Sequence, residues 1–248
     1  MNKLASGGNS FAIYSDETLN EFLNIVQIVN QANRVSTDGM VLIKAINGGT
    51  CYKLSFYNND GRAIKMCFNG TLCAVMYLFK AFQIAPKLLL MPDRSKFQVG
   101  VHNQKISLKF NAPHVVYNAE KLSIAKFEGI CYYIPYADDH KVYIMNNDCF
   151  FNSHNFLTAA KLLREQDRVF PKGANVHFVY ILNENVYIRH FEKGIEKETL
   201  SCGSGCIATA IILENNQYLK FFSPGGILEI YKKNSKQWEM VGLPNFLK

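Results

Sequence analysis

Two cysteines in this sequence stand in matching local contexts, and their residue type suits acid–base chemistry. Cys67 precedes Phe-Asn-Gly-Thr, Cys202 precedes Gly-Ser-Gly-Cys, and an apolar helical pattern follows each cysteine. The N-terminus of a helix carries unsatisfied backbone N–H groups and about half a positive charge, which favours a thiolate over a thiol and attracts a carboxylate. Each cysteine is therefore a candidate base or acid beside a candidate anion site.

Two such helix starts facing one another can hold a small amino acid by its α-carboxylate. The N–H groups that would bind the carboxylate belong to the residues after each cysteine: Phe68, Asn69, Gly203 and Ser204. Inverting a stereocentre requires a base that removes the Cα proton from one face and an acid that returns a proton to the other. We predict that Cys67 and Cys202 are this acid and base, and that no cofactor takes part.

The cysteines also admit two structural interpretations, packing and zinc binding. A lone cysteine before a glycine turn is more often a small buried hydrophobe, but two cysteines in matching contexts weaken that interpretation. Zinc would require Cys67 with Cys73, or Cys202 with Cys206, at spacings that match zinc motifs poorly. We therefore expect no metal. The remaining cysteines are predicted to be packing residues: Cys51, Cys73, Cys131, Cys149 and Cys206.

The elements that must position the two cysteines follow the same order in both halves of the chain. The first half predicts strands at 11–14, 40–43 and 54–57, helices at 19–29 and 71–82, and a further strand at 106–110. The second half predicts strands at 141–144, 176–179 and 186–189, helices at 156–164 and 207–213, and a further strand at 227–231. The cysteines lie 135 positions apart and the strands at 40–43 and 176–179 lie 136 apart, which indicates a duplication. We expect a mixed α/β protein of two pseudo-symmetric domains, 1–114 and 115–236, with the tail 237–248 returning to the first.

Composition excludes several other functions. The chain has 248 residues, 48% of them hydrophobic, and a formal net charge of +7 from scattered lysines and arginines. Scattered charges do not form the basic stripe of a nucleic-acid-binding protein, and no apolar run is long enough for a membrane span or a signal peptide. Seven cysteines form no even disulfide framework. We expect a cytoplasmic protein with free thiols, a small-molecule partner, and neither a nucleic-acid nor a membrane partner.

Motifs along nearly the whole chain resemble the diaminopimelate epimerase family. The most specific lie around the second cysteine: FPKGANVHFV at 170–179, EKG at 192–194 and ETLSCGSG at 198–205. Others follow in the family's order: GNSF at 8–11, YNNDG at 57–61, MCFNG at 66–70 and SPGG at 223–226. The resemblance implies two domains, each a curved, mostly antiparallel sheet wrapped around a central helix, with the active site in the cleft between them.

The resemblance also implies an activity and roles for single residues. The activity is interconversion of LL- and meso-diaminopimelate without pyridoxal phosphate, which supplies lysine and peptidoglycan synthesis. Cys67 and Cys202 match the catalytic pair, and His140 and Glu192 match residues that set the protonation of the thiols. The residues that match the family's substrate-binding positions are Asn9, Asn58, Phe68, Asn69, Asn175, Lys193, Gly203 and Ser204. A homodimer is one expected assembly, although the sequence leaves the oligomeric state open.

Four departures from the family's pattern bear on the substrate. Phe68 replaces a glycine, so its ring is expected to reshape the pocket, and Thr71-Leu72 replaces Ala-Arg. Asp138-Asp139 replaces Asn-Pro and Lys193 replaces an arginine, changes that should weaken binding of a distal carboxylate by a few kcal/mol. Diaminopimelate remains the expected substrate. The alternatives are an amino acid whose cationic or imidazole side chain pairs with Asp138, and a noncatalytic homologue that only binds.

Overall fold

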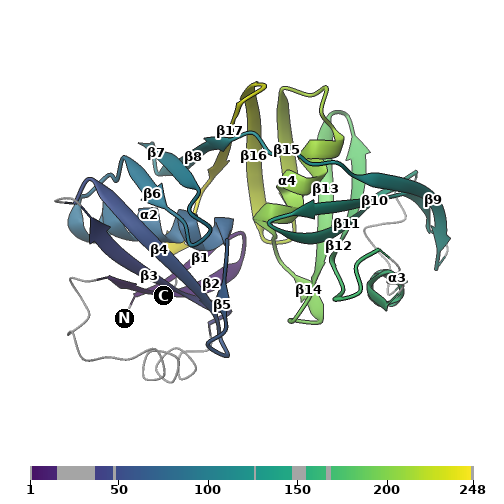
Figure 1. Cartoon of the computed structure of the whole chain (residues 1–248), viewed down its shortest axis with the longest axis horizontal. Helices are drawn as coiled ribbons and strands as arrows, with labels where there is room; N and C mark the ends of the chain where they lie inside the picture. Colours follow the sequence, from purple (N-terminus) through teal and green to yellow (C-terminus); the bar gives the residue numbers. More distant parts are fainter. Residues whose placement is uncertain are drawn as a thin grey trace. The chain divides into compact units, whose positions relative to one another are not determined.

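The computed structural model describes residues 2–15, 37–46, 49–125, 127–146, 155–165 and 169–246. Its contacts divide the chain into two compact units (Figure 1), one formed by residues 1–111 with 233–248 and the other by residues 112–232. The helix predicted at 19–29 and the packing role predicted for Cys149 lie outside the described residues. No helix within the described residues is long and apolar enough to cross a membrane.

In its described residues, the first unit is a sheet with one long helix against it. Its strands are β1 (Asn2–Ser6), β2 (Asn9–Ser15), β3 (Gly39–Ile46), β4 (Cys51–Asn58), β5 (Ala63–Ile64), β6 (Leu88–Leu90), β7 (Lys96–His102), β8 (Lys105–Asn111), β17 (Gln237–Gly242) and β18 (Asn245–Phe246). The pairing order is β18-β1-β2-β3-β4-β6-β7-β8-β17, with β5 beside β4. The pairs β2–β3 and β4–β6 are parallel and the others are antiparallel.

Helix α2 (Phe68–Phe82) forms the centre of the first unit. Every residue from Phe68 to Leu78 is buried, and the helix contacts β1, β2, β3 and β8. A helix that is apolar on all sides must be enclosed, and the sheet supplies that enclosure. The helix begins three residues before the predicted start at Thr71 and ends at the predicted residue, Phe82. Gln83 then takes the left-handed conformation, with φ of 59°, which stops the helix.

The second unit has the same kind of organisation. Its strands are β9 (Asn118–Ile124), β10 (Phe127–Tyr136), β11 (Asp138–Met145), β12 (Asn175–Leu182), β13 (Asn185–Glu192), β14 (Lys197–Thr199), β15 (Tyr218–Ser223) and most of β16 (Gly226–Asn234). The pairing order is β9-β10-β11-β12-β13-β15-β16, with β14 beside β13. Here β11–β12 and β13–β15 are the parallel pairs.

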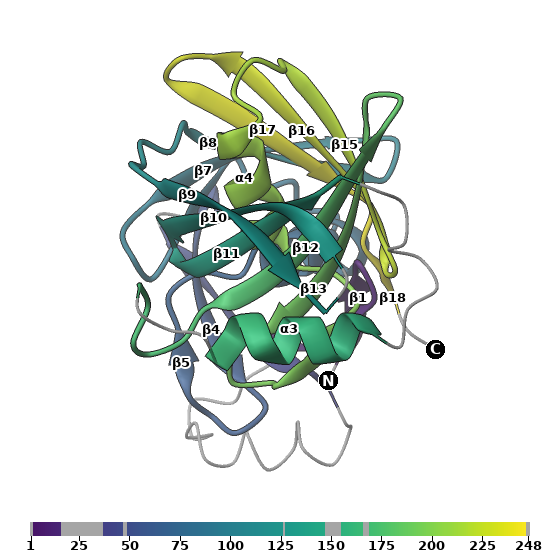
Figure 2. The ribbon, with the colours of Figure 1, turned by 90° about the vertical axis from the view of Figure 1, so that its right-hand side faces the viewer.

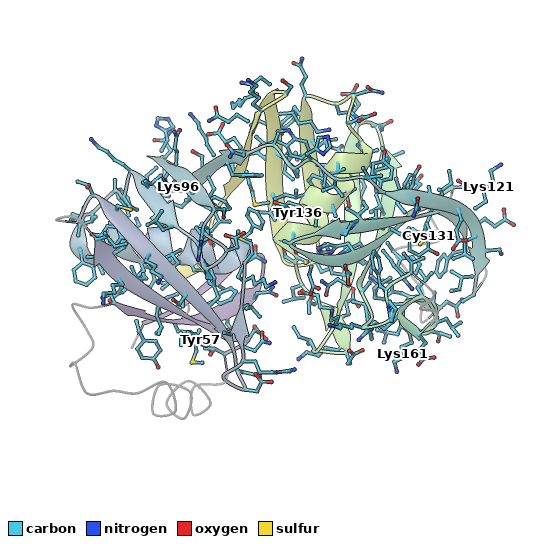
Figure 3. All side chains as sticks on the ribbon, in the orientation of Figure 1. Tyr57, Lys96, Lys121, Cys131, Tyr136 and Lys161 are labelled. Carbon is cyan, nitrogen blue, oxygen red and sulfur yellow. The ribbon has the colours of Figure 1, made fainter. Side chains whose placement is uncertain are left out.

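Two helices are described in the second unit. Helix α3 (Asn155–Glu165) is amphipathic and lies beside β12 (Figure 2), with Phe156, Ala159, Ala160 and Leu163 buried. Helix α4 (Gly203–Ile212) is almost entirely buried and contacts β10, β11 and β12. Cys131 on β10 (Figure 3) and Cys206 in α4 are fully buried, as is Cys73 in the first unit, so these three are packing residues as predicted.

The two units share one topology, as expected of a duplicated sequence. In each, five successive strands of the pairing order run antiparallel, parallel, antiparallel, parallel: β1-β2-β3-β4-β6 and β10-β11-β12-β13-β15. A short strand and then the cysteine-led helix come between the last two strands in both units. The predicted mixed fold, dominated by sheet and containing few helices, is confirmed.

Candidate active site

Cys67 is the N-cap residue of α2. It has extended backbone angles, φ −146° and ψ 101°, and its Sγ accepts a hydrogen bond from the Gly70 N–H at 3.3 Å. Its carbonyl accepts from the Thr71 N–H at 2.9 Å and from the Thr71 hydroxyl at 2.7 Å. The cysteine is half-buried. The sulfur therefore lies over the first turn of the helix, where the backbone N–H groups point.

Cys202 occupies the equivalent position in the second unit. It is the N-cap residue of α4, with φ −136° and ψ 105°, and its carbonyl accepts from the Cys206 N–H at 3.0 Å. Its Sγ lies 3.4 Å from the Ser204 hydroxyl oxygen, and the residue is 6% exposed. Two cysteines thus cap two helices in the same backbone conformation. The backbone N–H groups that these helix starts present to an anion include those of Phe68, Asn69, Gly203 and Ser204.

The environment of Cys202 holds it as a thiol. Burial raises the pKa of its thiol well above the usual value, the charge of Glu192 raises it further, and hydrogen bonds with Ser204 and Gly205 oppose these effects. Burial disfavours an unpaired thiolate because the charge loses its hydration. The expected preference for a thiolate at this helix start is therefore reversed. Glu192 is close enough for its charge to act on this thiol.

The ring of Phe68 lies in the core of the first unit and does not form part of a substrate pocket. It is 2% exposed, and its centroid lies 5.5 Å from the centroids of Phe97 and Phe110. An aromatic ring gains most by burial among other rings, so the chain directs it inward from the helix start. The expectation that Phe68 reshapes the pocket is wrong, and the residue can contribute only its backbone N–H. Thr71 and Leu72 are likewise fully buried.

Asn9 and Asn58 lie toward the same end of the first sheet. Asn9 begins β2, Asn58 ends β4, and Gly39 at the start of β3 pairs with Asn58 on one side and Phe11 on the other. The backbone of Asn58 closes a turn, because its N–H donates to the Arg62 carbonyl at 2.9 Å and its carbonyl accepts from Gly61. The two residues therefore stand at the same end of strands on either side of β3, and both match the family's substrate-binding positions.

Asn175, Lys193 and Asp138 are in direct contact in the second unit. The Asn175 Oδ1 accepts a hydrogen bond from the Lys193 backbone N–H at 2.9 Å, and its Nδ2 lies 3.5 Å from Asp138 Oδ2. The Lys193 Nζ is 3.2 Å from Asp138 Oδ1. Two departures from the family's pattern, the acid and the lysine, therefore pair with one another.

Three histidines form a buried chain across adjacent strands of the second unit. The His140 Nδ1 lies 2.7 Å from His177 Nε2, and the His177 Nδ1 lies 2.9 Å from His190 Nδ1. All three residues are 0% exposed. Among the histidines, the sequence pointed to His140 alone. For the other two, their position in the strands was the available signal. His177 stands between Val176 and Phe178, and His190 continues the buried alternation of Val186 and Ile188.

The histidine chain is neutral at physiological pH. Burial lowers the pKa of His140 to about 4 and that of His190 to about 3, and it lowers the pKa of His177 as well. Three neutral rings carry three protons, of which two occupy the shared hydrogen bonds. The third must lie on one outer nitrogen, His140 Nε2 or His190 Nε2, and neither atom has a hydrogen-bond partner among the described residues. The chain thus has two tautomeric arrangements.

These depressed pKa values predict acid sensitivity of the second unit. Below the unfolded-state pKa of about 6.5, the histidines of the unfolded chain bind protons, whereas those of the folded chain stay neutral. The free energy of unfolding is therefore fully present above that pH and decreases as the pH falls toward 4. One pKa unit corresponds to about 1.4 kcal/mol, so we expect a loss of about a few kcal/mol. Urea unfolding at several pH values measures it. His190→Gln should reduce the dependence of the free energy of unfolding on pH, whereas His102→Gln, at an exposed position, should leave it unchanged. The same pH dependence in the wild type and both variants would contradict the prediction.

Helix α4 meets the histidine chain at Gly205. A Cβ at this position would lie 2.4 Å from His177 Cε1 and 2.7 Å from both ring nitrogens, so no side chain fits. Gly205 stands in the first turn of α4, and its N–H is one of the groups that act on the Cys202 thiol. The histidine chain therefore supports the turn that holds Cys202. Within the described ranges, no group of three or more His, Cys, Asp or Glu side chains is arranged so that it could hold a metal ion.

Comparison with known proteins connects this arrangement to epimerases. No family model matches the sequence. A diaminopimelate epimerase of Hydrogenobaculum sp. is 30% identical over 88% of this chain and 78% of its own, and one of Aquifex aeolicus is 28% identical over 88% and 81%. A PhzF-family phenazine biosynthesis protein of Enterococcus faecalis has the same fold, with a TM-score of 0.72 at 18% identity, covering 100% of this chain and 96% of its own.

A protein described as a predicted epimerase, from Pseudomonas aeruginosa, also shares the fold, with a TM-score of 0.66 at 8% identity, over 100% of this chain and 96% of its own. These structural likenesses establish the architecture, and the curated relatives point to an epimerase. Sequence identity of 30% across most of both chains is the stronger finding. By that criterion this chain belongs to the diaminopimelate epimerase family.

Proposed function

We propose that this protein is an epimerase or racemase that inverts the α-carbon of an amino acid without a cofactor, with Cys67 and Cys202 as the two proton-transfer groups. The observation that carries the proposal is the pair of N-capping cysteines in the same backbone conformation, φ −146° and ψ 101° against φ −136° and ψ 105°. Two unrelated packing cysteines have no reason to share this placement at duplicated positions.

In the proposed mechanism both helix starts serve one substrate. Their N–H groups bind the α-carboxylate and stabilise the negative charge that moves onto it when the Cα proton leaves. One sulfur, as thiolate, removes the proton from one face of Cα, and the other, as thiol, donates a proton to the opposite face. Because burial keeps Cys202 protonated at rest, Cys67 is the base for one substrate configuration, and the roles exchange for the other.

Diaminopimelate is the substrate candidate that the relatives support. The curated relatives carry that name, and Asn9, Asn58 and Asn175 stand at the positions that resemble the family's substrate-binding asparagines. Such an activity would supply lysine and peptidoglycan synthesis.

A second candidate substrate is a different amino acid. The observation that favours it is the ion pair of Asp138 with Lys193, at 3.2 Å. A distal carboxylate would require the ammonium group of Lys193, and Asp138 already pairs with that group.

Isotope exchange tests the proposal directly. The purified protein is incubated in D2O with single stereoisomers of diaminopimelate and of a panel of free amino acids, and deuterium at Cα is followed by NMR together with the configuration of the product. We expect exchange accompanied by inversion for at least one substrate, with no added cofactor. A protein that exchanges no Cα proton of any amino acid would be a binding homologue, and the proposal would then be wrong.

A further inference from the structure

The contacts of Asp138 suggest what kind of substrate this site selects, an inference that rests on the proposed function. Asp138 begins β11, and its two carboxylate oxygens are both engaged. The Oδ1 lies 3.2 Å from the Lys193 Nζ and accepts from the Asp139 N–H at 2.9 Å, while the Oδ2 lies 3.5 Å from the Asn175 Nδ2. Lys193 and Asn175 both match the family's substrate-binding positions, and the resemblance associates Lys193 with binding of a distal carboxylate.

The orientation of the Asn175 amide is determined by its partners. Its Oδ1 accepts from the Lys193 backbone N–H at 2.9 Å, and a backbone N–H can only donate. The Nδ2 must therefore be the atom that faces Asp138, where it acts as a donor to the carboxylate. Asn175 is 6% exposed, so the surrounding protein restricts any other orientation.

We infer that Asp138 takes the place of a substrate's distal carboxylate, so that this protein prefers an amino acid whose side chain lacks one. A bound carboxylate is stabilised by a cation and by N–H donors, and here the carboxylate of Asp138 already has both kinds of partner. An incoming distal carboxylate would have to displace Asp138 from Lys193 and would then lie beside the displaced anion. A substrate without that group leaves the contacts intact.

Solvent limits the size of this effect but not its direction. The side chain of Asp138 is 50% exposed and that of Lys193 is 27% exposed, so water screens the ion pair. Asp138 is nevertheless tethered at 3.2 Å from the ammonium, and a tethered group competes at a high effective concentration. A preference of about tenfold or more is therefore the expected scale.

Lysine and diaminopimelate form a matched pair of probes, because lysine is diaminopimelate without the distal carboxylate. We expect the wild-type protein to invert lysine with a higher kcat/KM than diaminopimelate in the D2O assay. Asp138→Asn should remove the competing anion and keep an amide in its place, which raises kcat/KM for diaminopimelate relative to lysine by at least about tenfold. Asp93→Asn, which removes an exposed carboxylate of the first unit, should leave the ratio unchanged.

The possible outcomes separate this inference from the proposed function. A wild-type protein that prefers diaminopimelate, with a ratio that Asp138→Asn does not change, would overturn the inference and leave the two-thiol mechanism standing. Exchange with no amino acid at all would overturn both. Because the ratio of two kcat/KM values is compared within one protein, a general loss of folded Asp138→Asn protein cannot imitate the expected shift, and thermal unfolding curves verify the fold.

Discussion

Replacing Cys202 with alanine is expected to abolish inversion at Cα, with a loss of about 10³-fold or more in kcat/KM. The reason is that the methyl group can neither donate nor accept the proton on that face of the substrate. Cys67→Ala should have an effect of the same size. The fold should survive both changes, because α4 retains its buried apolar residues and α2 retains its own. Polarimetry or chiral chromatography of the product measures the loss.

Isotope exchange sharpens this prediction. A variant with one remaining thiol can still remove and return a proton on a single face, so each single variant should exchange Cα deuterium in one stereoisomer only. The two variants should favour opposite stereoisomers. Serine at either position should be poor as well, because an alcohol is a far weaker acid than a thiol. Cys51→Ala, at the half-buried start of β4, is the matched control and should keep wild-type rates. Near-normal inversion by Cys202→Ala would exclude the mechanism.

Gly205→Ala is expected to give the next largest loss, about 10²-fold in kcat. The added Cβ would lie 2.4 Å from His177 Cε1, so either the ring or the first turn of α4 must move. A shifted turn misplaces Cys202 and the N–H groups beside it, and overpacking of this kind costs about 1–3 kcal/mol of stability. Steady-state kinetics and the melting temperature together report the effect.

A compensating change distinguishes this steric cause from a general defect. His177→Ala removes the ring that the new Cβ would meet, so the double variant should be more stable than the sum of the two single changes allows. Gly70→Ala is the comparison at the other helix start, where an added Cβ would meet Val41, Cys67 and Phe56 at 3.1, 3.2 and 3.3 Å. These contacts are tight but longer than the 2.4 Å contact at Gly205, so Gly70→Ala should lose less stability than Gly205→Ala. Gly205→Ala with wild-type kinetics and melting temperature would show that the contact has no importance.

Local patterns were sufficient to predict the three described helices and eight of the eighteen described strands, mainly the buried ones. The strands at 40–43 and 176–179 lie within β3 and β12, because each is a short, mainly apolar run that is buried on both faces. The helix at 156–164 lies within α3, because its periodicity reflects one buried face. Strand β9 is among the strands that were not predicted, since five of its seven residues are exposed and it lacks an apolar alternation. The prediction placed the start of helix α4 too late. Its first turn is Gly-Ser-Gly, and these residues rank low in helix propensity although they are favourable at a helix N-terminus.

The sequence by itself determined the identity of the two cysteines, their place before two helices and the resemblance to an epimerase family, because these features depend on residues close together in the chain. Only the tertiary structure decided that Asp138 pairs with Lys193, 55 positions away, and that His140 contacts His177, 37 positions away. It also directed the Phe68 ring into the core. Such contacts depend on the register between separate strands and on competition for buried volume, and neither can be read from a local pattern.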